Sequence, residues 1–160
     1  MRQLLFLLLA LGPTLSGCRP AKPSLHGRLE KPVPCPEQPD YLKVGARLRV
    51  VGVFTTWSLA AQAQWSRFQK VFPRFPSADV QFIAVFTDPD RKVVDEWVAA
   101  ERPPFRVVHD PHFGVCRRHV RAVPVTLMFD ARDRVLTFYS GHVTSDLLDA
   151  QIRDALGRVR

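Results

Sequence analysis

Closely spaced cysteines are missing from this chain. Its 160 residues include three cysteines, Cys18, Cys35 and Cys116, and no two of them are near neighbours in the sequence. A redox dithiol, or a metal site built on paired cysteines, usually shows two cysteines a few residues apart. The spacing therefore supports neither kind of site. A G-x-S-x-G nucleophile motif and internal repeats are also absent from the sequence.

Long apolar runs are equally scarce. The one near the N-terminus, residues 4–11, is too short to span a bilayer as a mature helix. It follows a basic start and precedes Leu15-Ser16-Gly17-Cys18, which resembles the lipobox at which bacterial lipoproteins are cleaved and acylated. This combination predicts a signal peptide over residues 1–17 and a lipid on Cys18. An ordinary secretory signal with a chance cysteine is the alternative. The lipid would attach the protein to a membrane of the bacterial cell envelope, facing the periplasm.

Acidic residues are fewer than basic ones, with 15 Asp and Glu against 23 Lys and Arg, which gives a net charge of +8. Such a balance can favour anionic lipid headgroups or nucleic acid. The basic residues are scattered along the chain, and an exported lipoprotein seldom meets nucleic acid. We therefore expect a solvated basic surface and no nucleic-acid partner. Apolar residues make up 46% of the chain, enough for the core of one globular domain.

Regular structure is not expected in the segment after Cys18, because this segment is rich in proline. Proline lacks an amide hydrogen and fixes φ, which excludes it from helix interiors and central strands. The composition predicts an extended tether over residues 18–40 and a folded domain over residues 41–160. The prolines of this tether are Pro20, Pro23, Pro32, Pro34, Pro36 and Pro39.

Strand and helix patterns alternate in the folded part. Runs of β-branched and aromatic residues predict strands, and apolar residues spaced by three and four predict helices. The order β-α-β-α-β-α-β-β-α indicates an α/β fold with a mixed central sheet and helices on both faces. Strands are expected at residues 48–54, 80–86, 105–108, 125–129 and 135–139, and helices at 58–72, between 90 and 103, from 110 to 119, and at 145–156.

Four segments carry a family resemblance. Residues 50–57 look like a strand that leads into an active-site tryptophan, and residues 105–111 look like a strand followed by Asp-Pro. Residues 120–126 look like a cis-proline segment, and residues 127–130 with Gly141 look like a terminal hairpin. In this order they resemble the thioredoxin-like superfamily, and within it the membrane-anchored thiol–disulfide proteins of the TlpA-like and AhpC/TSA (redoxin) type.

The sequence departs from this family at Trp57-Ser58-Leu59-Ala60-Ala61, where the family has Trp-Cys-x-x-Cys. Ser58 stands at the position of the attacking cysteine, and Ala61 stands at the position of the resolving one. Thiol–disulfide exchange needs a thiolate and a second sulfur, whereas a serine hydroxyl stays protonated. Redoxin-type peroxidase chemistry also needs a cysteine near this turn. We therefore expect neither activity there, and we expect Ser58 to cap the following helix.

Pro124 occupies the place of the family's cis-proline, which faces the dithiol and lies beside backbone that pairs with an extended substrate peptide. The resemblance thus implies a cis Val123–Pro124 bond and a groove formed by Trp57, Val123 and Pro124. An extended polypeptide would be its partner. A trans proline that opens an edge strand is the alternative.

Cys116 could be a small buried packing residue with exposed histidines around it, and it allows three further interpretations. On a helix, His112, Cys116 and His119 would share one face, and imidazole with thiolate suits copper or zinc, as in a copper or haem handling protein. Cys116 could instead be a redox centre. In an oxidising envelope Cys35 and Cys116 can also pair as a structural disulfide.

The sequence thus predicts a lipid-anchored envelope protein with a thioredoxin-like domain that has lost its dithiol. Its leading hypothetical function is to bind a partner polypeptide or envelope protein, or to act as an accessory subunit in thiol–disulfide homeostasis, with no cofactor. The enzymatic alternative is a thiol–disulfide oxidoreductase that works through Cys116 with Cys35.

Overall fold

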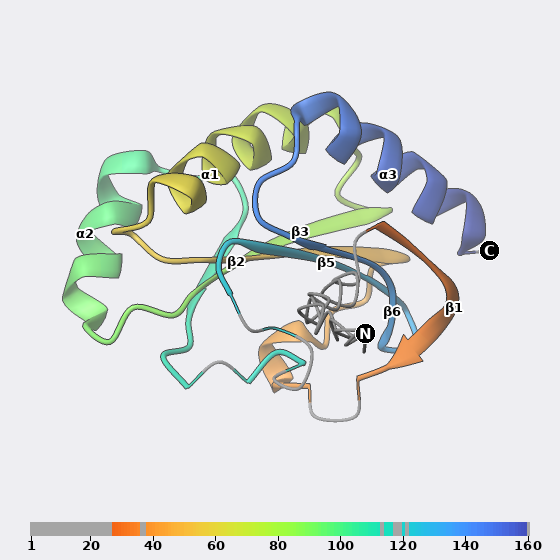
Figure 1. Cartoon of the computed structure of the whole chain (residues 1–160), viewed down its shortest axis with the longest axis horizontal. Helices are drawn as coiled ribbons and strands as arrows, with labels where there is room; N and C mark the ends of the chain where they lie inside the picture. Colours follow the sequence, from red (N-terminus) through yellow and green to blue (C-terminus); the bar gives the residue numbers. More distant parts are fainter. Residues whose placement is uncertain (1–26, 36–37, 113, 117–119, 121, 160) are drawn as a thin grey trace, which may run out of the picture.

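The computed structural model describes residues 27–35, 38–112, 114–116, 120 and 122–159. Within them a six-stranded sheet has the order β1-β6-β5-β2-β3-β4 (Figure 1). The predicted signal peptide and Cys18 lie outside this part of the chain and stay predictions. The elements are β1 (Gly27–Pro34), η1 (Asp40–Leu42), β2 (Leu48–Phe54), α1 (Leu59–Val71), η2 (Phe72–Arg74), β3 (Val80–Phe86), α2 (Arg91–Glu101), β4 (Arg106–His109), β5 (Val125–Asp130), β6 (Arg134–Ser140) and α3 (Ser145–Arg158). None of these helices is long and apolar enough to cross a membrane.

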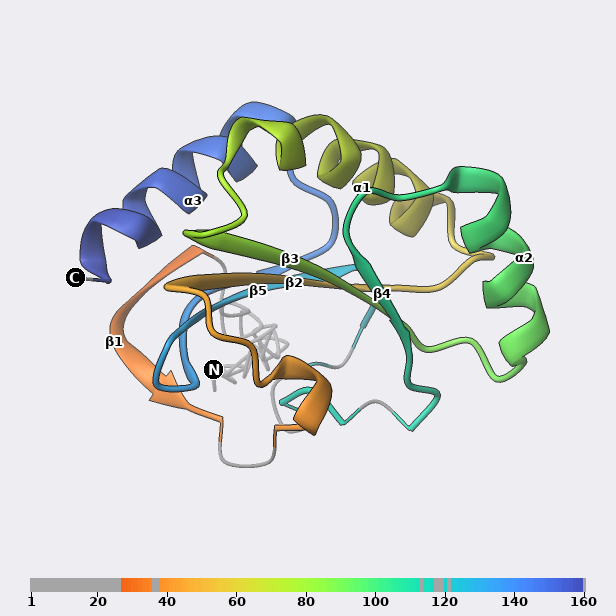
Figure 2. The same ribbon diagram turned by 180° about the vertical axis from the view of Figure 1, so that it is seen from behind.

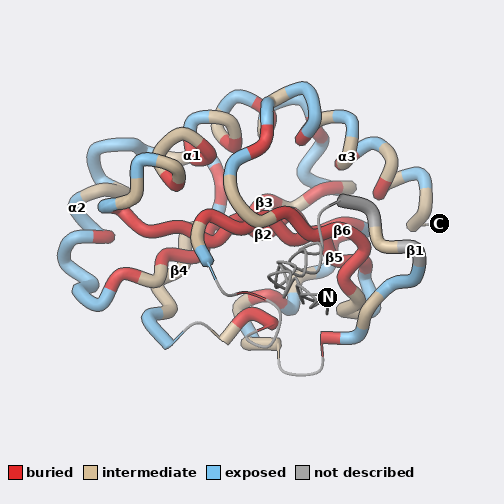
Figure 3. Tube along the Cα trace, viewed as in Figure 1, coloured by how far each residue is buried: buried red, intermediate tan, exposed pale blue. Residues whose placement is uncertain are grey.

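The sheet is mixed, as predicted. β2 pairs in parallel with β3, and β3 pairs in parallel with β4. β5 lies antiparallel to β2 on its other side and forms a hairpin with β6. Every residue of β2 is buried, and the buried residues follow the central strands (Figure 3). A strand that is covered on both faces needs a continuous apolar run, which is the pattern that β2 shows in the sequence.

β1 extends the sheet beyond the expected domain boundary. Residues 27–34, which the sequence assigned to the tether, pair antiparallel with β6 at the edge of the sheet. The pairing is irregular between Arg28 and Val33. Pro32 and Pro34 are tolerated because an edge strand has one side without a ladder partner. The folded unit therefore starts by Gly27.

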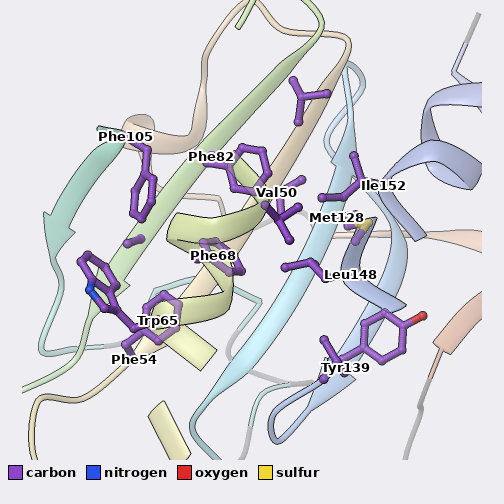
Figure 4. Close-up of a cluster of buried hydrophobic side chains, with 14 of the residues drawn as sticks. Val50, Phe54, Trp65, Phe68, Phe82, Phe105, Met128, Tyr139, Leu148 and Ile152 are labelled. Carbon is purple, nitrogen blue, oxygen red and sulfur yellow. The ribbon is translucent and has the colours of Figure 1, made fainter. Parts of the chain in front are cut away.

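One face of the sheet is covered by α-helices and holds an aromatic core. α1 and α3 lie side by side over this face (Figure 1), and α2 adds Val94 to the same core. The rings of Phe54 and Trp65 meet edge to face at a centroid distance of 5.6 Å, and those of Phe68 and Phe82 do so at 5.5 Å (Figure 4). Edge-to-face ring pairs add to the free energy gained by burial. This face supports the start of α1.

Helices were predicted on both faces, but on the opposite face the described residues form only the three-residue 3-10 helix η1 and no α-helix. Its apolar side chains pack under η1, under the residues that flank η1, and under the loop between β4 and β5. Figure 2 shows η1 on the side of the sheet away from α1 and α3. The side chains on this face of the sheet include Val51, Val53, Ile83, Val85, Leu127 and Phe129.

The short helix predicted from residue 110 to 119 is not formed by the described residues of that segment, which lie in turns and irregular backbone. The carboxylate of Asp110 accepts the backbone N–H groups of His112 at 3.2 Å and Gly114 at 2.8 Å. Such local bonds offer the backbone an alternative to helical hydrogen bonds. Cys116 has a φ of 47°, which lies in the left-handed region. The helix prediction was wrong because local capping and this turn were not visible in the apolar pattern.

A buried arginine fastens the cover on this second face. Arg49 in β2 is 2% exposed and donates hydrogen bonds to the backbone carbonyls of Leu42, at 2.7 Å, and Asp130. Its guanidinium also pairs with the carboxylate of Asp133 at 2.6 Å and lies over the ring of Phe129. A buried cation needs such partners to offset the loss of hydration. Arg49, which lies in β2, thus connects the last residue of η1 to the end of β5 and to the β5–β6 turn.

Candidate functional site

The turn from β2 into α1 is fixed by hydrogen bonds to the residues that follow β3. The backbone N–H and the hydroxyl of Thr56 donate hydrogen bonds to the carboxylate of Asp88, at 3.0 and 2.6 Å. Asp88 is buried, and its carbonyl lies 2.7 Å from Nε2 of His109. The N–H of Thr87 donates to the carbonyl of Phe54 at 3.0 Å. The turns after β2, β3 and β4 are therefore tied together at one end of the sheet.

Trp57 and Ser58 follow at the start of α1. Trp57 is 71% exposed, which is unusual for a tryptophan and leaves its ring available to a ligand. The oxygen of Ser58 accepts the N–H of Ala61 at 3.3 Å, so Ser58 is the helix N-cap. Ala61 is buried. The positions of the attacking and resolving cysteines thus hold a capping hydroxyl and a packing methyl group.

The Val123–Pro124 peptide bond is cis. Val125 pairs with Val53, which places the bond at the same end of the sheet as the Trp57 turn. The carbonyl of Pro124 accepts the N–H of Gly141 at 2.8 Å. Pro124 itself is buried, while Val123 is half-buried.

A groove of about 450 Å³ lies beside these residues. Trp57 and Val123, two of the three residues expected to form it, line its wall, and Pro124 does not. None of the described lining residues is ionisable, and Thr55 and Thr87 supply the polar side chains among them. The hydroxyl of Thr55 is buried and has no hydrogen-bond partner among the described residues. The lining residues are Thr55, Trp57, Thr87, Pro89, Pro111, Val120, Ala122 and Val123.

Gln64 is a site-supporting residue that the sequence analysis missed. It is fully buried within α1, where its amide oxygen accepts the N–H of Val143 at 2.9 Å. Its amide nitrogen donates to the hydroxyl of Thr126 at 3.4 Å. These bonds fix α1 against β5 and against the segment before α3. A glutamine within the apolar stripe of a helix was the signal that could have revealed it.

Cys35 and Cys116 form a disulfide, with their Cα atoms 5.6 Å apart. Both residues are buried on the second face. A sulfur in a disulfide is not the thiolate that a zinc or copper site requires. His112 is exposed and, without the predicted helix, does not share a helical face with Cys116, while His119 lies outside the described residues. Within the part of the chain that the structure describes, no group of three or more potential ligand side chains could hold a metal ion.

A hydrogen bond near the disulfide makes a second connection to the same loop. The hydroxyl of Tyr41 donates a hydrogen bond to the carboxylate of Asp110 at 2.6 Å. Burial, followed by this hydrogen bond and the negative charge of Asp110, raises the pKa of Tyr41 above its ordinary value. The segment before β2 is thus attached twice to the loop that begins with Asp110, and Pro111 of that loop lines the groove.

The comparison with protein families decides the chain's membership. The model of the AhpC/TSA family matches residues 39–140. The chain belongs to the AhpC/TSA family. The match covers the described residues of the groove, the Trp57 turn and Cys116, but not Cys35. No curated protein sequence matches the chain.

Solved structures similar to this AhpC/TSA domain share its fold. A Chlorobium tepidum protein described as a thiol:disulfide interchange protein DsbE is 19% identical, with a TM-score of 0.65, over 84% of this chain and 98% of the other. StoA from Bacillus subtilis is 16% identical, with a TM-score of 0.61, over 69% and 86%. A secreted Mycobacterium tuberculosis disulfide oxidoreductase homologous to Escherichia coli DsbE is 18% identical, with a TM-score of 0.58, over 68% and 81%. The predicted thioredoxin-like α/β fold is confirmed.

Proposed function

We propose that this AhpC/TSA protein binds an extended polypeptide in the groove beside Trp57 and does not exchange disulfides at the start of α1. The observation that carries the proposal is the pairing of an intact groove with Ser58 and Ala61 at the two cysteine positions. Disulfide exchange requires an attacking thiolate and a second sulfur, and neither residue has one. The hydrogen bond of Ser58 occupies its oxygen as an acceptor for the helix.

The chemistry of the groove supports an uncharged, apolar side chain as its ligand. Six of the eight described lining residues are apolar, Trp57 and Val123 among them, and none of the eight is ionisable. A ligand carboxylate or ammonium group would lose its hydration there without gaining a counter-ion from the described lining residues. An exposed tryptophan over a groove is a frequent centre of binding energy.

A lipid anchor on Cys18 and a location in the bacterial cell envelope belong to the same proposal. The short apolar run and the lipobox-like Leu15-Ser16-Gly17-Cys18 support the anchor. The similar M. tuberculosis protein is described as secreted, which supports a location outside the cytoplasm. Metabolic labelling with a fatty-acid probe tests the anchor. The wild type should take up the label and sediment with membranes, whereas Cys18→Ala should do neither.

The binding proposal is tested on an array of short unfolded peptides with the full chain. Peptides that contain a large apolar side chain should bind, and Trp57→Ala should weaken their binding by about tenfold or more. Leu59→Ala is the matched control, because Leu59 is 81% exposed and does not line the groove. Equal losses in both variants, or no selective binding by the wild type, would contradict the proposal.

The proposed lack of dithiol chemistry is tested by dithiothreitol-driven reduction of insulin. The wild type should not exceed the rate without protein. The double variant Ser58→Cys/Ala61→Cys should gain activity, since a cysteine at a helix N-terminus has a lowered pKa and the second sulfur resolves the mixed disulfide. Turnover that persists after Cys35→Ser/Cys116→Ser would overturn this part of the proposal, because that variant has no cysteine pair away from the start of α1.

A further inference from the structure

The segment before β2 is clamped to the loop that forms one wall of the groove. Three contacts make this clamp. The disulfide joins Cys35 to Cys116, and the hydroxyl of Tyr41 bonds the carboxylate of Asp110 at 2.6 Å. Gly114 lies so close to Pro39 that an added Cβ atom would meet the proline ring at 3.0 Å. The clamp thus holds the loop at its start and at Cys116.

The clamped loop continues directly into the groove. Pro111, Val120, Ala122 and Val123 line the groove and lie on both sides of Cys116 in the sequence. Cys116 has a φ of 47°, a backbone conformation that a residue with a Cβ atom seldom adopts. The bond to Cys35 therefore holds the loop in a conformation that its own backbone does not favour. Opening the bond would allow this wall of the groove to relax.

Both cysteines are nearly fully buried, at 5% and 4% exposed, and a separate hollow of about 220 Å³ borders one half of the disulfide. Cys35 lines this hollow, and Cys116 does not. Lys43 and Arg132, which are both exposed, also line it; Lys43 is paired with Asp40 at 2.7 Å, and Arg132 would attract an anionic thiolate. Asp133 in the same hollow is already paired with Arg49. The remaining lining residues are Pro34 and Gln38.

We propose that the Cys35–Cys116 disulfide is an exchange site that a dithiol reductant attacks at Cys35, and that its reduction loosens the groove wall. The attacking thiolate forms a mixed disulfide with Sγ of Cys35, the protein S–S bond breaks, and Cys116 leaves as a thiolate. The second thiol of the reductant then attacks its own mixed-disulfide sulfur and frees Cys35. Two electrons pass to the protein, and the reductant ends as a disulfide. The consequence for ligand binding rests on the proposed function, whereas the exchange step does not.

The site of attack is tested with glutathione on the full chain that carries Cys18→Ser. Glutathione has one thiol, so the mixed disulfide persists while iodoacetamide blocks the released cysteine. Peptide mapping by mass spectrometry should find glutathione on Cys35 and the carbamidomethyl group on Cys116. The reverse pattern would overturn the proposal. Absence of any adduct until denaturant is added would overturn it as well.

Single-cysteine variants in the same background check the access route without an exchange reaction. Cys116→Ser leaves Cys35 as a free thiol, and Cys35→Ser leaves Cys116. The thiol of Cys35 should react with an aromatic disulfide reagent about tenfold faster or more, because Cys35 alone lines the hollow. Circular dichroism verifies that both variants are folded. Equal rates in the folded variants would contradict the proposed direction of attack.

Loosening of the wall is tested by amide hydrogen exchange, which needs no groove ligand. Reduction should speed exchange at Gly114, whose N–H bonds the carboxylate of Asp110, by about tenfold. The amides of β2 and β5 should not change. Tyr41→Phe removes the second contact of the clamp and should enlarge the effect of reduction. Unchanged exchange at Gly114 after complete reduction would show that the disulfide does not hold the loop, whether or not the groove binds peptides.

Discussion

The two faces of the sheet are covered in different ways. On one face, three α-helices bury interlocking rings such as Phe54, Trp65 and Phe68. On the other face, loops and η1 are held by a disulfide, by the Tyr41–Asp110 hydrogen bond and by Arg49. The first cover gains its stability from many small contacts, whereas the second depends on a few strong ties. The groove borders the second cover, so its wall can be altered chemically while the domain stays folded.

The largest loss of stability is expected from a substitution in the aromatic core under the α-helices. Phe68→Ala should lower the free energy of unfolding by about 3–5 kcal/mol, because it removes a fully buried ring and leaves a cavity. Urea denaturation followed by circular dichroism measures the change. Leu59→Ala, at a position that is 81% exposed, is the control and should change stability by less than about 0.5 kcal/mol. A loss below about 1 kcal/mol for Phe68→Ala would show that this core is not tightly packed.

The next largest loss of stability is expected from removal of the disulfide. Its cysteines are separated by 81 residues, so the bond restricts a long loop in the unfolded chain. Replacement of Cys35 and Cys116 by alanine should lower the free energy of unfolding by about 2–4 kcal/mol. Oxidised and reduced wild type provide the comparison without mutation. Equal stability of the two forms would mean that the loop is held by other contacts.

The buried arginine should have a smaller effect. Arg49→Met leaves the carbonyls of Leu42 and Asp130 without their donor and should cost about 2 kcal/mol. Arg47→Met is a matched control, because Arg47 pairs with Asp79 on the surface and should contribute less than about 1 kcal/mol. Both are measured by denaturation in urea. Equal losses would indicate that burial of Arg49 does not strengthen its bonds.

The smallest effect is expected at Tyr41, and it depends on pH. Tyr41→Phe should lower stability by about 1 kcal/mol near neutral pH by removing the bond to Asp110. Burial and Asp110 raise the pKa of Tyr41 in the folded state above its ordinary value of 10.0. The stabilisation is therefore complete below pH 10 and is lost as the pH rises further, since the unfolded tyrosine then ionises first.

Thermal denaturation of the wild type and Tyr41→Phe between pH 7 and 11 measures this dependence. The difference between the two proteins should shrink above about pH 10. A difference that grows with pH would contradict the assigned direction of the pKa shift. Phenylalanine keeps the ring, so packing is preserved in the comparison.

Sequence patterns predicted the helical face well. The strands at residues 48–54 and 80–86 have the expected bounds, because a continuous apolar run between turn residues is a strong signal. The expected strand after Pro124 and the final helix are also present. These elements are specified by local composition together with their pattern of burial, which is continuous in β2 and one-sided in the final helix.

The second face was predicted poorly because its structure depends on contacts between distant residues. β1 was assigned to a tether, since proline-rich sequence does not reveal that an edge strand is available to pair with it. The loop after Asp110 was assigned to a helix, since side-chain caps compete with helical bonds only in the folded geometry. Of the groove, the family resemblance supplied Trp57 and Val123. Thr87, Pro89 and Pro111 join them only through the topology of the sheet.

β1 also bears on self-association. An exposed sheet edge is a template for pairing with another copy, and prolines, lysines and irregular pairing prevent such pairing. β1 contains Lys31, Pro32 and Pro34, and its register with β6 is broken. Without β1 the backbone of β6 would have no partner on one side, and β6 contains the buried side chains of Leu136 and Phe138. The proline-rich strand therefore protects the domain from aggregation, and a chain shortened to residue 41 would be expected to form β-rich assemblies.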